Sequence, residues 1–344
     1  MKLSTFILRR LALSIVVLLG LSLLIFVISR VVPGDPVRLA LGARAPQEVV
    51  DNISAEMHLD KSYPFQYVMW LKGVVQGDFG TSLYTRRNVS QDIRAFLPAT
   101  LELAIYSGIM MTFFGILLGV LSVQKKNSWV DNIVRIISYL GVVTPAFIFA
   151  IIFVLLFGFY MDAFPISGRL SPGVTAPPFI TGMITIDSLI TGNFRAYFNA
   201  LTHLFLPALS LAMAGLSQQA RIARSSMSDN LQKDYILAHR AYGISERKIM
   251  FKYLLKPSLI PTVSILGLDF AALLSNAFLV ELVFNWPGIS RYGVNAILRK
   301  DLNAVAAVVM ILGITFVLVN IVVDVVVAYL DPRIRMRRDR SSAI

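Results

Sequence analysis

The sequence has no cysteine and few charged residues. Without cysteine the chain cannot form a disulfide framework, a thiolate metal site or a cysteine nucleophile. Only three histidines are present, His58, His203 and His239, and their spacing does not make a ligand cluster. Charged residues account for 15% of the 344 residues and hydrophobic residues for 56%. This composition excludes a soluble domain of that length and indicates an integral membrane protein.

Catalytic motifs are also missing. No glycine is followed by lysine, so the chain has no G-x-x-x-x-G-K-[ST] phosphate loop and is expected to bind neither ATP nor another cofactor itself. No Gly-x-Ser-x-Gly elbow, H-E-x-x-H motif or pair of acids stands in a convincing context. We therefore expect no enzyme. A membrane enzyme stays as a minor alternative, as does a secondary transporter or channel not driven by ATP, although no internal repeat of two halves is visible.

Long uncharged runs fill much of the chain, and each is long enough to cross a bilayer as a helix. They predict an all-α protein with six spans at about 11–29, 103–123, 136–161, 201–220, 258–280 and 302–323. Pro145 lies inside the third run and predicts a tilt or kink there. The predicted organisation is an amino-terminal segment (1–10), a first span (11–32), an external loop region (33–98), a transmembrane core (99–335) and a basic tail (336–344).

The net charge of +12 is distributed unevenly. Lysine and arginine cluster at 1–10, 125–135, 333–340 and, above all, in a polar stretch of the core at 221–258, which we call the polar loop. Short basic segments stay on the cytoplasmic side of a membrane protein. Both termini and the polar loop are therefore expected in the cytoplasm. The lipid bilayer accounts for the positive charge, and no nucleic-acid partner is expected.

Two helical stretches around one glycine make up the polar loop. Gly243 can adopt the positive φ that ends a helix. Ser245 is a plausible N-cap of the next helix, and Glu246 lies in its first turn, where the helix dipole favours an acid. Pro257 and Pro261 are expected to break or kink the chain as it re-enters apolar sequence.

The residues of this loop carry a resemblance. They resemble the cytoplasmic EAA loop of ABC importer permeases, in the version of the dipeptide and oligopeptide permease family, at Tyr235, Ala238, Arg240, Ala241, Gly243, Ser245 and Glu246. In that family the loop contains a coupling helix that docks into a groove on an ATPase subunit. Leu237 stands where the family has an acid. Apolar Ile249 and Phe251 beside basic Arg247 suit such docking. The competing interpretations are a basic loop that only fixes topology and an ordinary helix cap at Gly243.

Four further strings resemble the same family in the same order: PGDPV with a following LG near residue 33, GDFGTS at 77–82, ELVFNWPG at 281–288 and DPRIR at 331–335. The resemblance implies a fold like that of type I ABC importers and a permease subunit that takes up dipeptides, oligopeptides or a similar solute. It also implies an inner-membrane location and several partners: a second related permease subunit, two ATPase subunits that hold ATP and Mg²⁺, and an external solute-binding protein.

Polar residues within or beside the spans are candidates for a pathway or for contacts between subunits. Such residues are costly in a bilayer and are expected to face a cavity or a partner helix. They are Glu102, Asp269, Asn276, Glu281 and Asp324. Asp269 lies deepest, and a contact with the second permease subunit is as good an interpretation of it as a role in the pathway.

Overall fold

The structure is a computed structural model that describes residues 3–30, 37–38, 45–56 and 58–330. The regular elements in these residues are helices, apart from one isolated β-bridge between Thr81 and Asn88. In chain order they are α1 (Leu3–Arg30), α3 (Gln47–Glu56), α4 (Tyr63–Gln76), α5 (Val89–Gln124), α6 (Trp129–Val143), α7 (Ala146–Phe153), the π-helical turn η1 (Val154–Tyr160), α8 (Ile184–Ile190), α9 (Phe194–Leu231), α10 (Asp234–Ala241), α11 (Glu246–Lys248), the π-helical turn η2 (Ile249–Leu254), α12 (Leu255–Val283), α13 (Ile289–Leu298) and α14 (Leu302–Leu330). The predicted all-α class is confirmed.

Five helical segments of the described chain are long and apolar enough to cross a membrane: 10–29, 89–124, 194–231, 246–283 and 302–323. A sixth candidate is the pair formed by α6 and α7 with η1, which is bent by 115°. The break falls where Thr144 is extended (φ −87°, ψ 124°) before Pro145. Proline lacks an N–H and disfavours the helical conformation in the residue before it. The kink predicted at Pro145 is therefore a sharp break, and the six-span pattern holds if the bent pair is one span.

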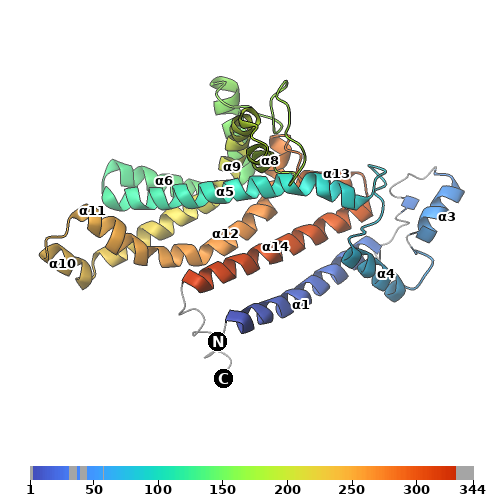
Figure 1. The fold of residues 1–344 in the computed structure, drawn as a ribbon, viewed down its shortest axis with the longest axis horizontal. Helices are drawn as coiled ribbons and strands as arrows, with labels where there is room; N and C mark the ends of the chain where they lie inside the picture. The colour runs from blue at the N-terminus through green and yellow to red at the C-terminus, as the bar shows by residue number, and fades with distance from the viewer. Residues whose placement is uncertain (1–2, 31–36, 39–44, 57, 331–344) are drawn as a thin grey trace.

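The long helices form an elongated bundle (Figure 1). Helices α1, α5, α12 and α14 run along its long axis, with α10 and α11 at one end and α3 and α4 at the other. We call these the loop end and the α3–α4 end. Helix α5 approaches α9 closely at Gly115 and Gly119, where a Cβ atom would lie 2.6 Å from Gln219 Cβ and 2.7 Å from Ala223 Cβ. These small residues allow the two backbones to meet, as is common between membrane helices.

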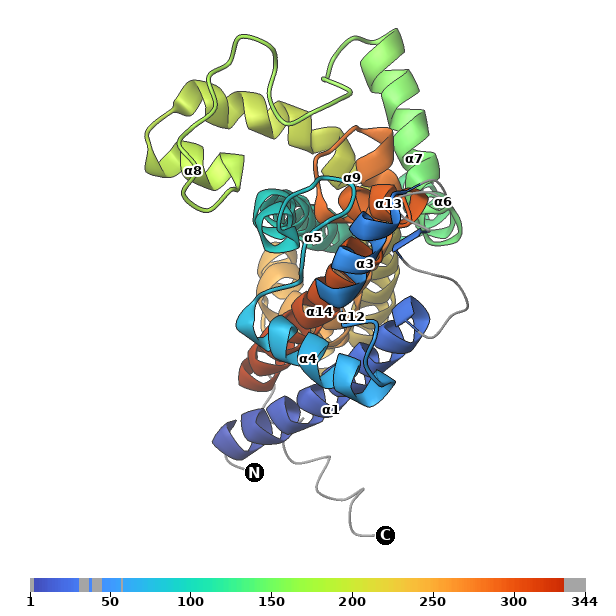
Figure 2. The same ribbon diagram turned by 90° about the vertical axis from the view of Figure 1, so that its right-hand side faces the viewer.

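A lateral arm leaves the bundle at the broken span. Figure 2 shows α7 on one side of this arm and α8 with the start of α9 on the other. Helix α8 is short, and no candidate span of the described chain lies between residues 162 and 193. Asp187 in the first turn of α8 holds the segment before the helix, because its carboxylate accepts hydrogen bonds from the backbone N–H groups of Ile180, Thr181 and Gly182 at 3.2, 2.8 and 3.0 Å.

Of the break or kink expected at Pro257 and Pro261, the break is wrong, because the helix continues from Glu246 to Val283 through both prolines. Pro257 follows the π-helical turn η2 by three residues, inside this continuous helix. Pro261 lies inside a membrane helix, where neighbouring groups can satisfy the carbonyl that it leaves free. The expected strings at 33–36, 41–42 and 331–335 and the tail at 336–344 lie outside the described residues.

Candidate functional site

Gly243 adopts the predicted positive φ, +71°, directly after α10. The Ile244 N–H donates to the His239 carbonyl at 3.1 Å, and the Gly243 N–H donates to the Arg240 carbonyl at 2.9 Å. This pair of bonds is the Schellman motif, which ends a helix through one left-handed residue. Gly243 is thus a helix cap, and this cap also sets the angle between α10 and the helix that begins at Glu246.

An ion pair spans the turn. The Arg240 guanidinium donates to the Glu246 carboxylate through Nε at 2.7 Å and Nη2 at 3.2 Å. The hydrogen bond from Arg240 to Glu246 raises the pKa of Arg240 above its ordinary value. Ser245 is extended at the N-cap position, but its side chain makes no capping hydrogen bond. The turn therefore depends on Gly243 and on the pair of charges, both of which lie at the surface of the loop end.

The polar loop has a small hydrophobic core of its own. Ile249, which is 1% exposed, packs there with Ile236 and Leu254 against Val120 and Val123 of α5. The expectation that Ile249 offers an apolar side chain to a partner must therefore be corrected. Ile249 is apolar, as docking would require, but its side chain is buried against α5 and is not available to a partner. Ile249 holds the loop to the bundle.

Other side chains form the exposed apolar surface of the loop. Tyr242 is 84% exposed beside Gly243, and Leu237 is 56% exposed on α10. Phe251 is half exposed, but it lines an apolar groove with Phe113 of α5 and Phe270 of α12. Sequence reasoning missed Tyr242 and Leu237. Leu237 could have been found from the sequence, because it is an apolar residue at a position where the family has an acid.

The remaining loop residues named from the sequence surround this turn. Ala238 accepts the hydrogen bond of Tyr242 N–H at 3.0 Å, and Ala241 is the last residue of α10. Tyr235 lies at the edge of the loop core, where burial raises the pKa of its phenol, and Arg247 lies exposed in α11. All of the predicted loop residues are thus within one compact helix–turn–helix unit.

A buried network links the loop end to the broken span. Asp131 of α6 is fully buried and accepts hydrogen bonds from Arg224 Nε at 2.8 Å and Arg135 Nη2 at 2.6 Å, as well as one from Ser122 of α5. Arg224 belongs to α9, in the part of that helix that begins the polar loop. Removing one partner from such a buried pair is strongly destabilising, so α5, α6 and α9 are held together here.

A polar cavity of about 160 Å³ lies between α6, α9 and α12. It is lined by Asp269, Asn276 and Gln218 together with the apolar or small residues Val142, Leu211, Ala214, Gly215, Ala272 and Leu273. Val142 is the last residue but one of α6, so the cavity adjoins the 115° break. Two of the polar span residues predicted from the sequence, Asp269 and Asn276, are therefore brought together.

Asp269 is held by two glutamines that sequence reasoning did not single out. Its Oδ2 accepts from Gln219 Nε2 at 2.5 Å, and its Oδ1 lies 3.4 Å from Gln218 Nε2. Gln219 is fully buried, and its Oε1 has no hydrogen-bond partner among the described residues. Buried polar groups without a partner are rare in folded proteins. Gln219 is not part of the cavity lining, so the polar groups that face the cavity are the Asp269 carboxylate and the side-chain amides of Gln218 and Asn276.

Glu102 lies outside this cavity and fastens the lateral arm. Its carboxylate accepts from Arg169 Nη2 at 2.5 Å and from the backbone and hydroxyl of Thr185, each at 2.7 Å. Both Glu102 and Thr185 are buried. The contacts of Glu102 are therefore within the chain and join α5 to the arm.

Glu281 is likewise buried in contacts of its own chain. It accepts from the Thr100 hydroxyl at 2.5 Å and from the Arg291 N–H at 2.8 Å. A Cβ atom on Gly288 would lie 2.2 Å from its carboxylate, which explains the glycine of the ELVFNWPG string. Trp286 completes the turn by donating to the Ala99 carbonyl at 2.9 Å. The fifth predicted residue, Asp324, lies in α14, and its side chain is outside the described residues.

The fold and these sites define a class: a polytopic helical membrane protein with a polar cavity between its spans and a structured polar loop at one end. Family comparison gives the next step. Residues 111–336 match the family described as binding-protein-dependent transport system inner membrane component, and residues 3–104 match its amino-terminal membrane component. The chain belongs to this family.

Curated relatives agree over nearly the whole chain. It is 40% identical to a probable D,D-dipeptide transport system permease protein of Escherichia coli K12, over 93% of this chain and 94% of the relative. It is 36% identical to a di/tripeptide transport system permease protein of Pseudomonas aeruginosa, over 97% and 99%. A dipeptide permease of Alkalihalophilus pseudofirmus is 35% identical, over 95% and 98%.

The chain is accordingly a multi-pass inner-membrane permease subunit of an ABC importer, a component of translocation and not an enzyme. Such a permease works with a solute-binding protein and an ATPase. The predicted family and the predicted class of function are confirmed.

Proposed function

We propose that this permease subunit carries short peptides through the membrane and that Asp269 binds their amino-terminal ammonium group. The cavity at the broken span supports the proposal, because it places the Asp269 carboxylate and the side-chain amides of Gln218 and Asn276 between three spans. The names of the relatives suggest the solute class, since the three relatives described above are named for the transport of dipeptides or of di- and tripeptides. A zwitterionic peptide complements such a cavity at its cationic end.

We infer that ATP acts from the loop end. Two ATPase subunits hold ATP and Mg²⁺ and bind the exposed surface around Tyr242, Leu237 and the Arg240–Glu246 pair, while a second related permease subunit completes the pathway. Movement of the loop reaches α6 through the Asp131–Arg224 contacts, and α6 ends beside the cavity. Two packings of the spans, each favoured by different contacts, then give inward and outward access.

The orientation in this proposal follows the placement of lysine and arginine. The loop end and both termini lie in the cytoplasm, and the α3–α4 end lies outside. Single-cysteine labelling is straightforward in a chain without native cysteine. A cysteine at exposed Thr81 should react with a membrane-impermeant maleimide from outside in whole cells, and one at Tyr242 only after the membrane is opened. The opposite pattern would reverse the orientation.

Uptake by the complete importer in lipid vesicles tests the solute and the site. Labelled dialanine should be taken up only with ATP, and N-acetyl-dialanine, which lacks the ammonium group, should compete poorly. Asp269→Asn should lower dialanine uptake at least about tenfold, as expected for a lost hydrogen bond to a charged group. Asp162→Asn removes one exposed carboxylate away from the cavity and should leave uptake unchanged. Equal competition by the acetylated peptide, or normal uptake by Asp269→Asn, contradicts the proposed site.

A further inference from the structure

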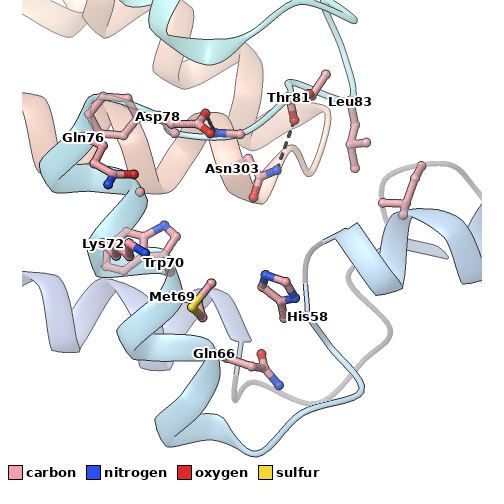
Figure 3. Close-up of a pocket in the computed structure, with 14 residues that line it drawn as sticks. His58, Gln66, Met69, Trp70, Lys72, Gln76, Asp78, Thr81, Leu83 and Asn303 are labelled. Atoms are coloured by element: carbon pink, nitrogen blue, oxygen red, sulfur yellow. Dashed lines mark hydrogen bonds between the residues drawn. The ribbon is translucent and has the colours of Figure 1, made fainter.

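A second cavity lies at the α3–α4 end, far from the polar loop and separate from the cavity at Asp269. Its volume is about 400 Å³, within the usual range for small-ligand sites. Figure 3 shows its walls: α4 supplies Gln66, Trp70 and Lys72, the turn after α4 supplies Asp78, and Asn303 comes from the start of α14. Segments distant in sequence thus close around one polar hollow.

Gln66 gives this cavity an unsatisfied acceptor. Its side chain is 5% exposed, and its Nε2 donates to the Lys61 carbonyl at 2.8 Å. Its Oε1 is buried without a hydrogen-bond partner among the described residues, and the side chain lines the cavity beside Met69 and His58. A buried amide oxygen left unpaired is costly, and a donor on a bound molecule would satisfy it.

The charges of the lining have opposite signs. Lys72 and Asp78 are both exposed at the cavity, and within the described part of the chain they form no ion pair with each other or with other residues. The Asp78 carboxylate is oriented by the Gly80 N–H, which donates to its Oδ1 at 3.0 Å. Trp70 adds an aromatic surface to the same lining. An anion site, a cation site, a hydrogen-bond acceptor and an apolar wall match a short zwitterionic molecule.

We propose that this cavity is a second binding site for a short zwitterionic peptide, at the outer end of the permease. The carboxylate of the peptide binds Lys72, its ammonium group binds Asp78, and a peptide N–H donates to Gln66 Oε1. The inference rests on the proposed function for the choice of peptide as ligand and for the outward position of this end. A peptide held here is concentrated at the permease next to its last span, since the start of α14 lines the cavity.

Calorimetric titration of the importer complex in lipid nanodiscs, without ATP and without the solute-binding protein, tests the site with dialanine as the probe. Lys72→Gln and Asp78→Asn should each weaken dialanine binding about three- to tenfold, because each removes one exposed charged partner. Gln66→Met should weaken it at least as much. Lys125→Gln and Asp162→Asn remove the same charges elsewhere and should bind dialanine as the unmodified complex does.

The arms of the experiment separate this inference from the proposed function. Asp269→Asn should leave the affinity assigned to the outer cavity unchanged. Dialanine binding that is lost in Asp269→Asn but normal in Lys72→Gln and Asp78→Asn overturns the outer site and supports the inner one. No binding up to about 10 mM dialanine also overturns it, while ATP-dependent uptake by the complete importer, measured separately, would leave the proposed function standing. Equal binding of N-acetyl-dialanine amide, which carries neither charge, counts against the outer site as well.

Discussion

Replacing Gly243 by valine should uncouple ATP hydrolysis from transport while leaving the spans in place. Gly243 has φ +71°, and a Cβ built on it meets no atom within 4 Å. A substitution therefore adds backbone strain and no collision. The left-handed conformation costs an L-residue roughly 1–2 kcal/mol, less for asparagine and more for a β-branched residue.

The size of the effect follows from that strain. Because about 1.4 kcal/mol changes an equilibrium tenfold, Gly243→Ala should reduce the population of the turn several-fold to tenfold, and Gly243→Val further. Gly243→Asn should stay close to the original residue, since asparagine tolerates this conformation best after glycine. If the turn orients the loop toward the ATPase, peptide uptake should be highest in Gly243→Asn, lower in Gly243→Ala and lowest in Gly243→Val.

The assay is uptake of labelled dialanine and ATP hydrolysis by the same importer vesicles. Uptake per ATP should fall along the series while the ATPases remain bound, as measured by co-purification. Gly173→Val is a matched control, because Gly173 has φ +83°, also has no atom near its Cβ, and lies in the lateral arm away from the loop. Uptake in Gly243→Val equal to the original would show that Gly243 is only a local helix cap, and an equal loss in both variants would show that the strain acts through general stability.

Three further predictions follow from buried groups. Glu281→Leu should lower the free energy of unfolding by about 1–3 kcal/mol, because the Arg291 N–H loses its acceptor. Thermal unfolding in detergent measures this change, and Glu281→Gln should lower the free energy of unfolding less than Glu281→Leu does. An equal decrease in the two variants would contradict the role of this hydrogen bond. Gly119→Leu should separate α5 from α9, because even a Cβ atom added to Gly119 would lie 2.7 Å from the Cβ of Ala223. This variant should give less folded protein than Gly20→Leu, because a Cβ added to Gly20 would have no atom within 4 Å. Burial alone would raise the pKa of Asp187, but the hydrogen bonds to its carboxylate outweigh burial and lower the pKa below its ordinary value, so the stabilisation that Asp187 gives is present above about pH 4 and is lost as the pH falls through the folded-state pKa. Amide hydrogen exchange in residues 180–187 should therefore become faster at acidic pH in the original chain, and should already be fast at neutral pH in Asp187→Ala. Exchange that does not change with pH would contradict this role of the carboxylate.

Much of the fold could be read from local pattern. Long uncharged runs indicate membrane helices, because a segment in a bilayer must satisfy each backbone N–H and C=O within its own helix. Such segments can be recognised from their length and composition alone. The positive φ of Gly243 was predictable for a similar reason, since glycine between two helical stretches has a local conformational role. Motif order was sufficient for the family. These features depend on a few neighbouring residues, and a single sequence contains them.

Errors arose where a residue's role depends on distant partners. The sequence shows Ile249 as apolar on a helix face, but only packing against α5 decides that the face points inward. It shows Glu102 and Glu281 as acids near spans, and only the contacts with Arg169 and Thr100 show that they hold the chain together. Pro261 illustrates the converse, since a neighbouring environment can allow a helix to pass through a local helix breaker.

The sequence by itself thus determined that the protein is a membrane protein with six apolar runs and a basic loop, and that it lacks a phosphate-loop motif for ATP. Only the tertiary structure decided which polar side chains meet and which of them line a common cavity. It brought Asp269 together with Gln218, Gln219 and Asn276, and it placed Gln66 of α4 in one cavity with Asn303 of α14. The physical reason is the range of the forces involved. Helix formation and insertion follow from local hydrogen bonding and hydrophobicity, whereas a cavity exists only where helices far apart in the chain pack imperfectly and leave polar groups unpaired.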